Sequence, residues 1–347
     1  MKKNYAYKIH GINLLLVSSN RSLKSAIDHQ LAFFSTPFDS NDAFDIVIDD
    51  YSSKPIFAEY QVASEYYYFH NELMDIPSHK LCFDISGGIH KYFIDHFTLP
   101  VNLIIQLALQ RKGKTLVHSA SISYQDTNIL LPALGGIGKT TLVSEVMKKG
   151  GSLYGDDMCI IDQDANMYAY PIDFSVYHYH YDLLGIKRGF IDRVKAAISS
   201  FLKLFDKVPL ISWITIRVRG KFFPECKNIS PISIYGRDRI AKTSKMNKLI
   251  YIGRHASTSK SVIQNNPSPE AIADKITTIL LSEWKDSLAF LQIYSTFSSE
   301  FSYLEMCNQI YETSFKMASR TQLEDISIDS NVKNKEYIDM LWKCLWN

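Results

Sequence analysis

Residues 133–140, with the sequence Ala-Leu-Gly-Gly-Ile-Gly-Lys-Thr, constrain the fold more than any other stretch of this chain. Three glycines stand within four positions, and only glycine readily adopts the positive φ angles that a tight phosphate-binding loop requires. In such a loop, successive backbone N–H groups point toward nucleotide phosphates, and the following helix adds the positive end of its dipole. The run matches the phosphate-loop pattern, with Ala133 in place of the usual first glycine.

The flanking residues favour the same interpretation. The apolar run 129–132 predicts a buried strand before the loop. After the loop, apolar residues recur at helical spacing, and Gly150 and Gly151 predict the end of that helix. A strand–loop–helix order is the context that this motif requires. The residues expected to bind nucleotide are Gly135, Gly136, Ile137, Gly138, Lys139, Thr140 and Thr141.

Two side chains of the loop have an expected role in phosphate chemistry. The Lys139 ammonium group is expected to reach the β- and γ-phosphates, and the Thr140 hydroxyl is expected to bind Mg²⁺. ATP and Mg²⁺ are therefore the expected cofactors. The alternative is a degenerate loop that has kept the fold and lost turnover.

Composition narrows the range of partners. The chain has 347 residues and a formal net charge of +2, which gives no reason to expect nucleic acid or an anionic membrane as a partner. The five cysteines are scattered without metal-binding spacing, as is typical of reduced thiols in the cytoplasm. The chain shows no signal peptide, and no apolar run approaches the ~18 residues of a membrane helix. We therefore expect a cytoplasmic protein.

The fold class expected from these patterns is α/β, with a nucleotide-binding core between two other regions. Residues 1–97 carry short apolar and aromatic runs separated by turn residues, which is typical of strands. Residues 98–255 contain the glycine-rich loop and form the core. Residues 256–347 are predicted to be mainly helical, with a helix that begins at Ser268.

Two local signals give further expectations. Thr98 followed by Pro100 predicts the start of a helix, because threonine is a good N-cap and proline is tolerated in the first turn. The mostly polar run 327–334 predicts a flexible connection before a C-terminal helix.

Titratable residues stand at characteristic distances from the loop. His118 lies fifteen residues before Ala133, and Asp156 and Asp157 follow the end of the loop by sixteen and seventeen residues. Asp182 lies twenty-six residues beyond Asp156. Phosphoryl transfer can use one carboxylate for the metal and another for the acceptor hydroxyl. Because neighbouring side chains of a strand point to opposite faces, the adjacent pair is expected to divide these roles.

Each of these residues also has a structural interpretation. The Asp-Asp pair can simply begin a turn, and His118 can be a core histidine with satisfied hydrogen bonds. Asp182 can be an ordinary surface carboxylate.

The set of residues around the loop resembles the HPr kinase/phosphorylase family, which is related to the phosphoenolpyruvate carboxykinases. In that family a His-Gly strand precedes the phosphate loop, an Asp-Asp pair ends the next strand, and a Glu-X-Arg-Gly segment follows. Here Ser119 follows His118 in place of glycine, and Asp182 and Leu184 stand where the family has Glu and Arg. The resemblance covers roughly residues 115–190, and the loop combined with the Asp-Asp pair is its specific part.

The resemblance implies a phosphate-loop core of the HPr kinase/phosphoenolpyruvate carboxykinase type. It implies an ATP-dependent kinase that transfers the γ-phosphate to a serine hydroxyl of a peptide or small protein, as in peptide-modification systems. It assigns Asp157 as the catalytic base and Asp156 as the metal ligand beside Thr140, with the exchange of the two left open. His118 is expected to orient or modulate the base, and Asp182 to complete the catalytic set. A homo-oligomer is in keeping with this family.

Other functions remain compatible with the sequence. The acceptor can be free serine, another small metabolite or inorganic phosphate, and the loop can belong to an ordinary NTPase. The chain can also be a non-catalytic protein whose binding is gated by nucleotide. The intact Lys139, Thr140 and Asp-Asp pair argue against this last alternative.

Overall fold

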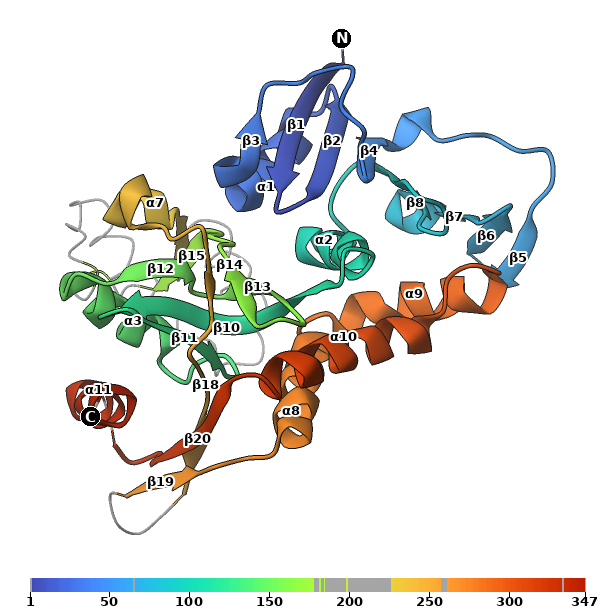
Figure 1. Ribbon diagram of the computed structural model, residues 1–347. Coiled ribbons are helices and arrows are strands. Elements are labelled where there is room, and N and C mark those ends of the chain that lie inside the picture. Colours follow the sequence, from blue (N-terminus) through green and yellow to red (C-terminus); the bar gives the residue numbers. More distant parts are fainter. Residues whose placement is uncertain are drawn as a thin grey trace.

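The computed structural model describes residues 2–64, 66–177, 226–256, 261–332 and 334–346, together with three single residues, Tyr181, Leu184 and Ile198. Within these ranges the architecture is α/β, with two large mixed sheets and helices between and around them (Figure 1). Asp182 lies outside the described residues.

The first sheet is built from the N-terminal residues and has nine strands. Its spatial order is β3-β1-β2-β4-β9-β8-β7-β6-β5. The strands are β1 (Lys3–Ile9), β2 (Ile12–Ser18), β3 (Ser35–Thr36), β4 (Ile46–Asp50), β5 (Gln61–Ser64), β6 (Tyr67–His70), β7 (Leu73–Ile76), β8 (Leu81–Asp84) and β9 (His90–Ile94). The central strands β2, β4 and β9 pair in parallel, and the remainder of the sheet is antiparallel.

The second sheet carries the candidate site. Its main path is β17-β14-β13-β10-β11-β18-β20-β19, and β12 also pairs with β10. The strands are β10 (Lys114–Tyr124), β11 (Thr127–Pro132), β12 (Ser152–Gly155), β13 (Met158–Asp162), β14 (Asn166–Tyr168), β17 (Thr243–Lys245), β18 (Lys248–His255), β19 (Val262–Asn265) and β20 (Gln322–Asp329). A separate pair is formed by β15 (Phe174–Tyr177) and β16 (Cys226–Ile229).

Helices surround the two sheets. They are α1 (Arg21–Leu31), α2 (Val101–Gln110), α3 (Lys139–Lys148), α7 (Pro231–Tyr235), α8 (Pro269–Glu283), α9 (Lys285–Phe297), α10 (Tyr303–Ala318) and α11 (Asn334–Trp346). The predicted start of α8 is confirmed, because the Ser268 side chain accepts a hydrogen bond from Ala271 N and Pro269 occupies the first turn.

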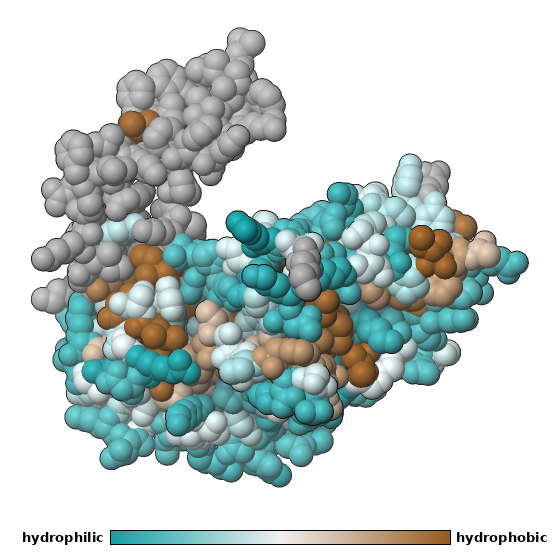
Figure 2. Space-filling view, turned by 90° about the horizontal axis from the view of Figure 1, so that it is seen from above, coloured by the Kyte–Doolittle hydropathy of each residue, from teal (hydrophilic) through white to brown (hydrophobic). Residues whose placement is uncertain are grey.

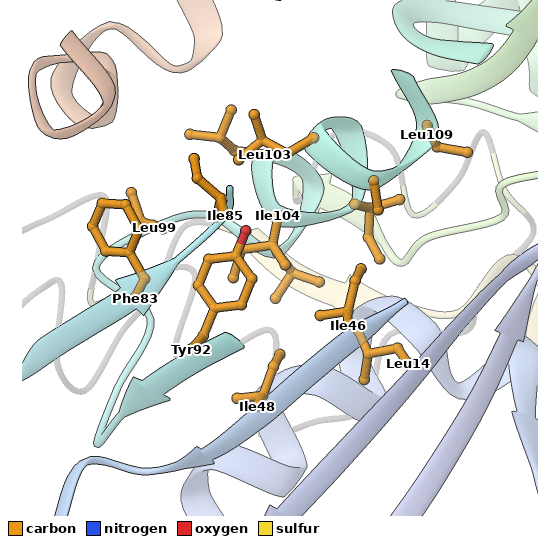
Figure 3. Close-up of a cluster of buried hydrophobic side chains, with 14 of the residues drawn as sticks. Leu14, Ile46, Ile48, Phe83, Ile85, Tyr92, Leu99, Leu103, Ile104 and Leu109 are labelled. Atoms are coloured by element: carbon orange, nitrogen blue, oxygen red, sulfur yellow. The ribbon is translucent and has the colours of Figure 1, made fainter. Parts of the chain in front are cut away.

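Helix α2 joins the two sheets and lies between them (Figure 1). It is apolar almost all round, as is typical of a helix buried on every side. Figure 3 shows side chains of α2, among them Leu103 and Ile104, gathered with residues of the first sheet such as Ile46 and Tyr92. The one fully buried polar side chain of α2, Gln106, accepts a hydrogen bond from Leu116 N on β10 and donates one to Thr115. A single core therefore continues from the first sheet to the second.

The second sheet is covered on both faces, and β13 shows how. Met158 and Ile160 belong to the core shared with α2, whereas Cys159 and Ile161 belong to a second core formed with α3, α8 and α11. Alternate residues of a strand point to opposite faces, so a strand between two cores is apolar throughout.

The alternation of side chains between the two faces of the sheet breaks in β10, at the place where the candidate site lies. Val117 and Ala120 both contribute to the core on the α3 side, although an odd spacing should place them on opposite faces. Residues up to His118 pair with β13, and residues from Ser119 onward pair with β11. His118 therefore stands beside the end of β11, where the glycine-rich loop begins.

Three expectations from the sequence are wrong in detail. The region after residue 256 is not only helical, because β19 and β20 complete the second sheet. Residues 327–329 belong to β20 and so do not form part of a flexible connection. The helix after Thr98 begins at Val101 with Pro100 as its N-cap, and the Thr98 hydroxyl instead donates to the His79 carbonyl.

Figure 2 shows the molecule from above. Hydrophilic side chains cover most of this face, and hydrophobic ones gather in small patches between them. None of the helices in the described part of the chain has the length and apolar character needed to cross a membrane.

The bend between β12 and β13 requires glycine at position 155. A Cβ on Gly155 would lie 2.0 Å from the Met158 carbonyl oxygen, which belongs to the backbone and cannot rotate away. We expect Gly155→Ala to lower the free energy of unfolding by about 1–3 kcal/mol, measured by urea denaturation. Gly87→Ala is the matched control, because a Cβ there meets nothing within 4 Å. Equal stability of the two variants would contradict this account of the bend.

Candidate functional site

The glycine-rich loop lies between β11 and α3, in the strand–loop–helix order predicted from the sequence. Gly136 and Gly138 have φ angles of 79° and 107°, which residues with a side chain rarely adopt. A Cβ at Gly135 or Gly136 would meet nothing within 4 Å, so the loop backbone is uncovered there. A Cβ at Gly138 would instead lie 2.8 Å from Cε1 of Tyr337, so α11 packs directly against the end of the loop.

The N-terminus of α3 presents uncapped backbone donors. Gly138 is the N-cap residue and has no side chain to accept a hydrogen bond, and the first turn, which the structure describes fully, contains no acidic residue. Lys139, Thr140 and Thr141 form that turn. The first N–H groups of a helix have no partner within the helix, and its dipole favours an anion beside them. The loop and this turn together can hold a phosphate group.

Lys139 directs its ammonium group back into the loop. The side chain is 8% exposed, and Nζ lies 2.7 Å from the Ala133 carbonyl oxygen and 3.1 Å from that of Leu134. The third contact, at 2.9 Å, is with Nε2 of His118 on β10. Burial lowers the pKa of Lys139, and the nearby carboxylates, with that of Asp157 the strongest, oppose this. Three acceptors match the three N–H groups of the ammonium.

Asp156 and Asp157 occupy the bend between β12 and β13, and they point in different directions. Asp156 is buried, and its Oδ2 accepts a hydrogen bond of 2.6 Å from the Thr140 hydroxyl. Its Oδ1 is also buried and has no hydrogen-bond partner among the described residues. Asp157 is exposed, and its backbone carbonyl accepts a hydrogen bond from Ser119 N, which ties the bend to β10. The pair therefore has one carboxylate inside the site and one at its surface.

The environment of Asp156 disfavours its charged form. Burial raises the pKa of Asp156 to about 7, and the charge of Asp157 acts in the same direction. The Thr140 hydrogen bond and the Lys139 ammonium oppose the rise. A carboxyl group in this position gains from a cation that stabilises its charged form.

His118 brings a further carboxylate into the site. Its Nδ1 is 3.7 Å from Asp157 Oδ1 and 3.8 Å from Glu283 Oε1, and the imidazole itself is buried. Burial and the charge of Lys139 lower the pKa of His118, whereas the two carboxylates raise it. The structural alternative for His118, a core histidine with satisfied hydrogen bonds, does not fit, because Nδ1 has no hydrogen-bond partner among the described residues.

The structure thus brings together most of the residues that the sequence singled out. Lys139, Thr140, Asp156, Asp157 and His118 surround the beginning of α3.

Glu283 was not identified from the sequence. It ends α8, far along the chain from the loop. The only signal available was an acidic residue at the end of a predicted helix, where basic residues are preferred.

Helix α11, the last helix of the chain, packs against the end of the glycine-rich loop. Tyr337 is 2% exposed, and the guanidinium carbon of Arg254 lies 3.8 Å from its ring centroid. Arg254 is held in turn by hydrogen bonds to the carbonyl oxygens of Asp329 and Val332. Stacked Tyr and Arg side chains attract each other, so this contact fixes α11 beside the loop.

The residues present fit a magnesium ion. Mg²⁺ prefers oxygen ligands and keeps several waters, so a hydroxyl and one carboxylate suffice from the protein. Thr140 and Asp156 supply them, and the unpartnered Oδ1 of Asp156 is the kind of buried polar atom that a metal satisfies. Within the described parts of the chain, no group of three or more His, Cys, Asp or Glu side chains is placed to hold a metal by itself.

Of the comparisons with known proteins, the one with solved structures gives matches. No protein-family model matches the chain, and no curated protein matches it. Among solved structures, the chain is similar to the Hpr(Ser) kinase/phosphatase from Coxiella burnetii, with 9% sequence identity and a TM-score of 0.25. The match covers 44% of this chain and 78% of that one. A TM-score this low does not establish a shared fold, and the interpretation of the site rests on its own residues.

The raised pKa of Asp156 predicts how stability depends on pH. The folded protein keeps a proton on Asp156 up to about pH 7, whereas the unfolded chain releases it near pH 4. The free energy of unfolding should therefore fall as the pH rises through this window. In urea denaturation at pH 5 and pH 8, we expect Asp156→Asn to show a smaller fall than the wild type, by at least about 1 kcal/mol.

Asp157→Asn is the control for this measurement. It removes the neighbouring exposed carboxylate and leaves the Asp156 carboxyl group in place, so it should keep most of the wild-type fall. An identical pH dependence for the wild type and Asp156→Asn would contradict the raised pKa.

Proposed function

We propose that this protein is an ATP-dependent kinase with a phosphate-loop core of the HPr kinase type. It transfers the γ-phosphate to a serine hydroxyl of a peptide or small protein in the cytoplasm. The observation that supports this proposal is the convergence of Lys139, the uncapped start of α3 and the Thr140–Asp156 pair. An exposed carboxylate, Asp157, stands next to this phosphate site and beside a buried imidazole.

In the proposed reaction, the loop amides and Lys139 hold the β- and γ-phosphates of ATP. When ATP binds, the N–H of Lys139 that donates to the Leu134 carbonyl, the longest of its three contacts, can turn to a phosphate oxygen while the contacts with Ala133 and His118 remain. The positive end of the α3 dipole and the ammonium group stabilise negative charge that develops on the transferred group.

Asp157 accepts the proton of the acceptor hydroxyl. The oxygen of that hydroxyl forms a bond to the γ-phosphorus, and the bond between this phosphorus and the β,γ-bridging oxygen breaks. ADP leaves with that oxygen, and the phosphate monoester remains on the acceptor. In this scheme His118 modulates the base, because its Nδ1 faces the Asp157 carboxylate and its Nε2 contacts Lys139. When bound, Mg²⁺ would neutralise phosphate charge beside Thr140 and Asp156.

The assignment of Asp157 as base and Asp156 as metal ligand agrees with their surroundings. A base must reach an incoming acceptor, and Asp157 is at the surface. A metal ligand beside the loop must face Thr140, and Asp156 does so.

The proposal is tested by phosphoryl transfer followed by mass spectrometry. The purified protein is incubated with Mg·ATP and a panel of HPr, serine peptides and free serine, and a gain of one phosphate on the acceptor is measured. Asp157→Asn should lower kcat about 10²–10⁴-fold, the usual contribution of a general base. Its affinity for nucleotide, measured by calorimetry, should stay close to that of the wild type, because Asp157 faces the acceptor.

Lys139→Met should weaken nucleotide binding as well as transfer, since it removes the ammonium group from the loop. Lys148→Met is the matched control on the same helix, because Lys148 is exposed and pairs with Glu145 at the surface. Unchanged turnover in Asp157→Asn would exclude it as the base. Nucleotide binding without transfer to any acceptor and without hydrolysis would indicate a nucleotide-gated binding protein instead.

A further inference from the structure

Three polar groups converge on one point beside the exposed side of the site. His118 Nδ1 lies 3.7 Å from an oxygen of Asp157 and 3.8 Å from an oxygen of Glu283. Both distances are too long for a hydrogen bond, and each is short enough for one polar atom to contact both groups. The imidazole is only 5% exposed, whereas the Asp157 and Glu283 side chains are 53% and 39% exposed. Among the described residues this buried nitrogen has no hydrogen-bond partner and faces two exposed carboxylates, so it is the kind of atom that a bound ligand satisfies.

The contacts of Lys139 determine which hydrogen-bonding group His118 offers at this point. The charged ammonium donates to the carbonyl oxygens of Ala133 and Leu134 and to Nε2 of His118. A neutral imidazole that accepts at Nε2 carries its proton on Nδ1. The point is therefore bounded by one N–H donor and two carboxylates that only accept. A hydroxyl fits between His118 and Asp157, because it accepts from the first and donates to the second.

Among the described residues, no donor is left for Glu283 in this arrangement. A hydroxyl has a single proton, which Asp157 receives, so Glu283 can accept from a second donor on the same acceptor. The charge of Glu283 raises the pKa of Lys139, but the three N–H groups of Lys139 already have acceptors.

The position of Glu283 on its helix favours a charged donor. Glu283 is the last residue of α8, and the last turn of this fully described helix contains no basic residue. The carbonyl end of a helix carries the negative end of the dipole, so a carboxylate there concentrates negative potential. This potential attracts a cation more strongly than it attracts a neutral amide N–H group.

We propose that the acceptor carries a primary ammonium group next to its hydroxyl, and that Glu283 binds this ammonium group while Asp157 and His118 bind the hydroxyl. The inference rests on the proposed kinase function, because it identifies the acceptor of that reaction. The chemical class is a β-amino alcohol, which includes ethanolamine, free serine and the N-terminal serine of a peptide. A cationic acceptor also offsets the repulsion between the exposed carboxylates and the phosphates of ATP.

The test compares free and N-acetylated acceptors, since acetylation removes the positive charge and keeps the hydroxyl. Initial rates with Mg·ATP are measured for ethanolamine, L-serine and a peptide with an N-terminal serine, each beside its N-acetylated form. We expect acetylation to raise the KM for the acceptor at least about tenfold, as for the loss of a hydrogen bond to a charged group. The KM for ATP should not change. The three acceptors show whether the substrate is a simple amino alcohol, a free amino acid or a peptide.

The variant Glu283→Gln provides a second, independent test of the same inference. It should raise the KM for the free amines by a similar factor, with a smaller change in kcat, and it should leave the KM for the acetylated forms and for ATP unchanged. Glu270→Gln is the matched control, because Glu270 lies at the opposite end of α8 and is exposed. It should reproduce the wild-type constants.

Failure of this inference differs from failure of the proposed function. Equal KM values for free and acetylated acceptors, or transfer only to internal serines, would overturn the inference and leave the kinase in place. A uniform effect of Glu283→Gln on both forms would also overturn it. No transfer to any acceptor, together with none to the wider peptide panel, would overturn both.

Discussion

A buried ammonium group, that of Lys139, is the constraint around which the candidate site is arranged. Burying a charge is costly unless hydrogen bonds and opposite charges compensate it. The compensation comes from four separate segments: two loop carbonyls, the His118 imidazole on β10, the carboxylates of Asp156 and Asp157 on the bend after β12, and the more weakly acting carboxylate of Glu283 on α8. The loop, the central strand and the bend must therefore come together for the lysine to be buried.

The irregular pairing of β10 allows the loop, the strand and the bend to come together. A regular strand between two cores would bury every side chain in apolar contacts. One edge of β10 pairs with β13 up to His118 and with β12 from Ser121, which leaves a short gap into which the bend between β12 and β13 fits. Gly155 permits that bend at a distance from the Met158 carbonyl that no other residue tolerates. Polar side chains thus lie within an otherwise apolar sheet.

The site holds its groups in states that lower the stability of the free protein. Asp156 is buried with one oxygen that has no hydrogen-bond partner in the described part of the chain, and burial raises its pKa to about 7. His118 faces two carboxylates without a hydrogen bond to either. Strain and unsatisfied polar groups are found where a ligand relieves them, and the nucleotide, metal and acceptor proposed above would do so here.

The sequence by itself determined the strand, the glycine-rich loop and the helix, because local spacing and the backbone freedom of glycine decide these over a few residues. It also singled out His118 and the Asp156–Asp157 pair. It did not predict that residues 327–329 pair within the sheet, because strand pairing depends on partners distant in the sequence. Only the tertiary structure placed Glu283 beside His118 and Tyr337 against the loop. The packing of α8 and α11 on the second sheet decides those contacts, and no local pattern encodes which face of a distant helix meets the site.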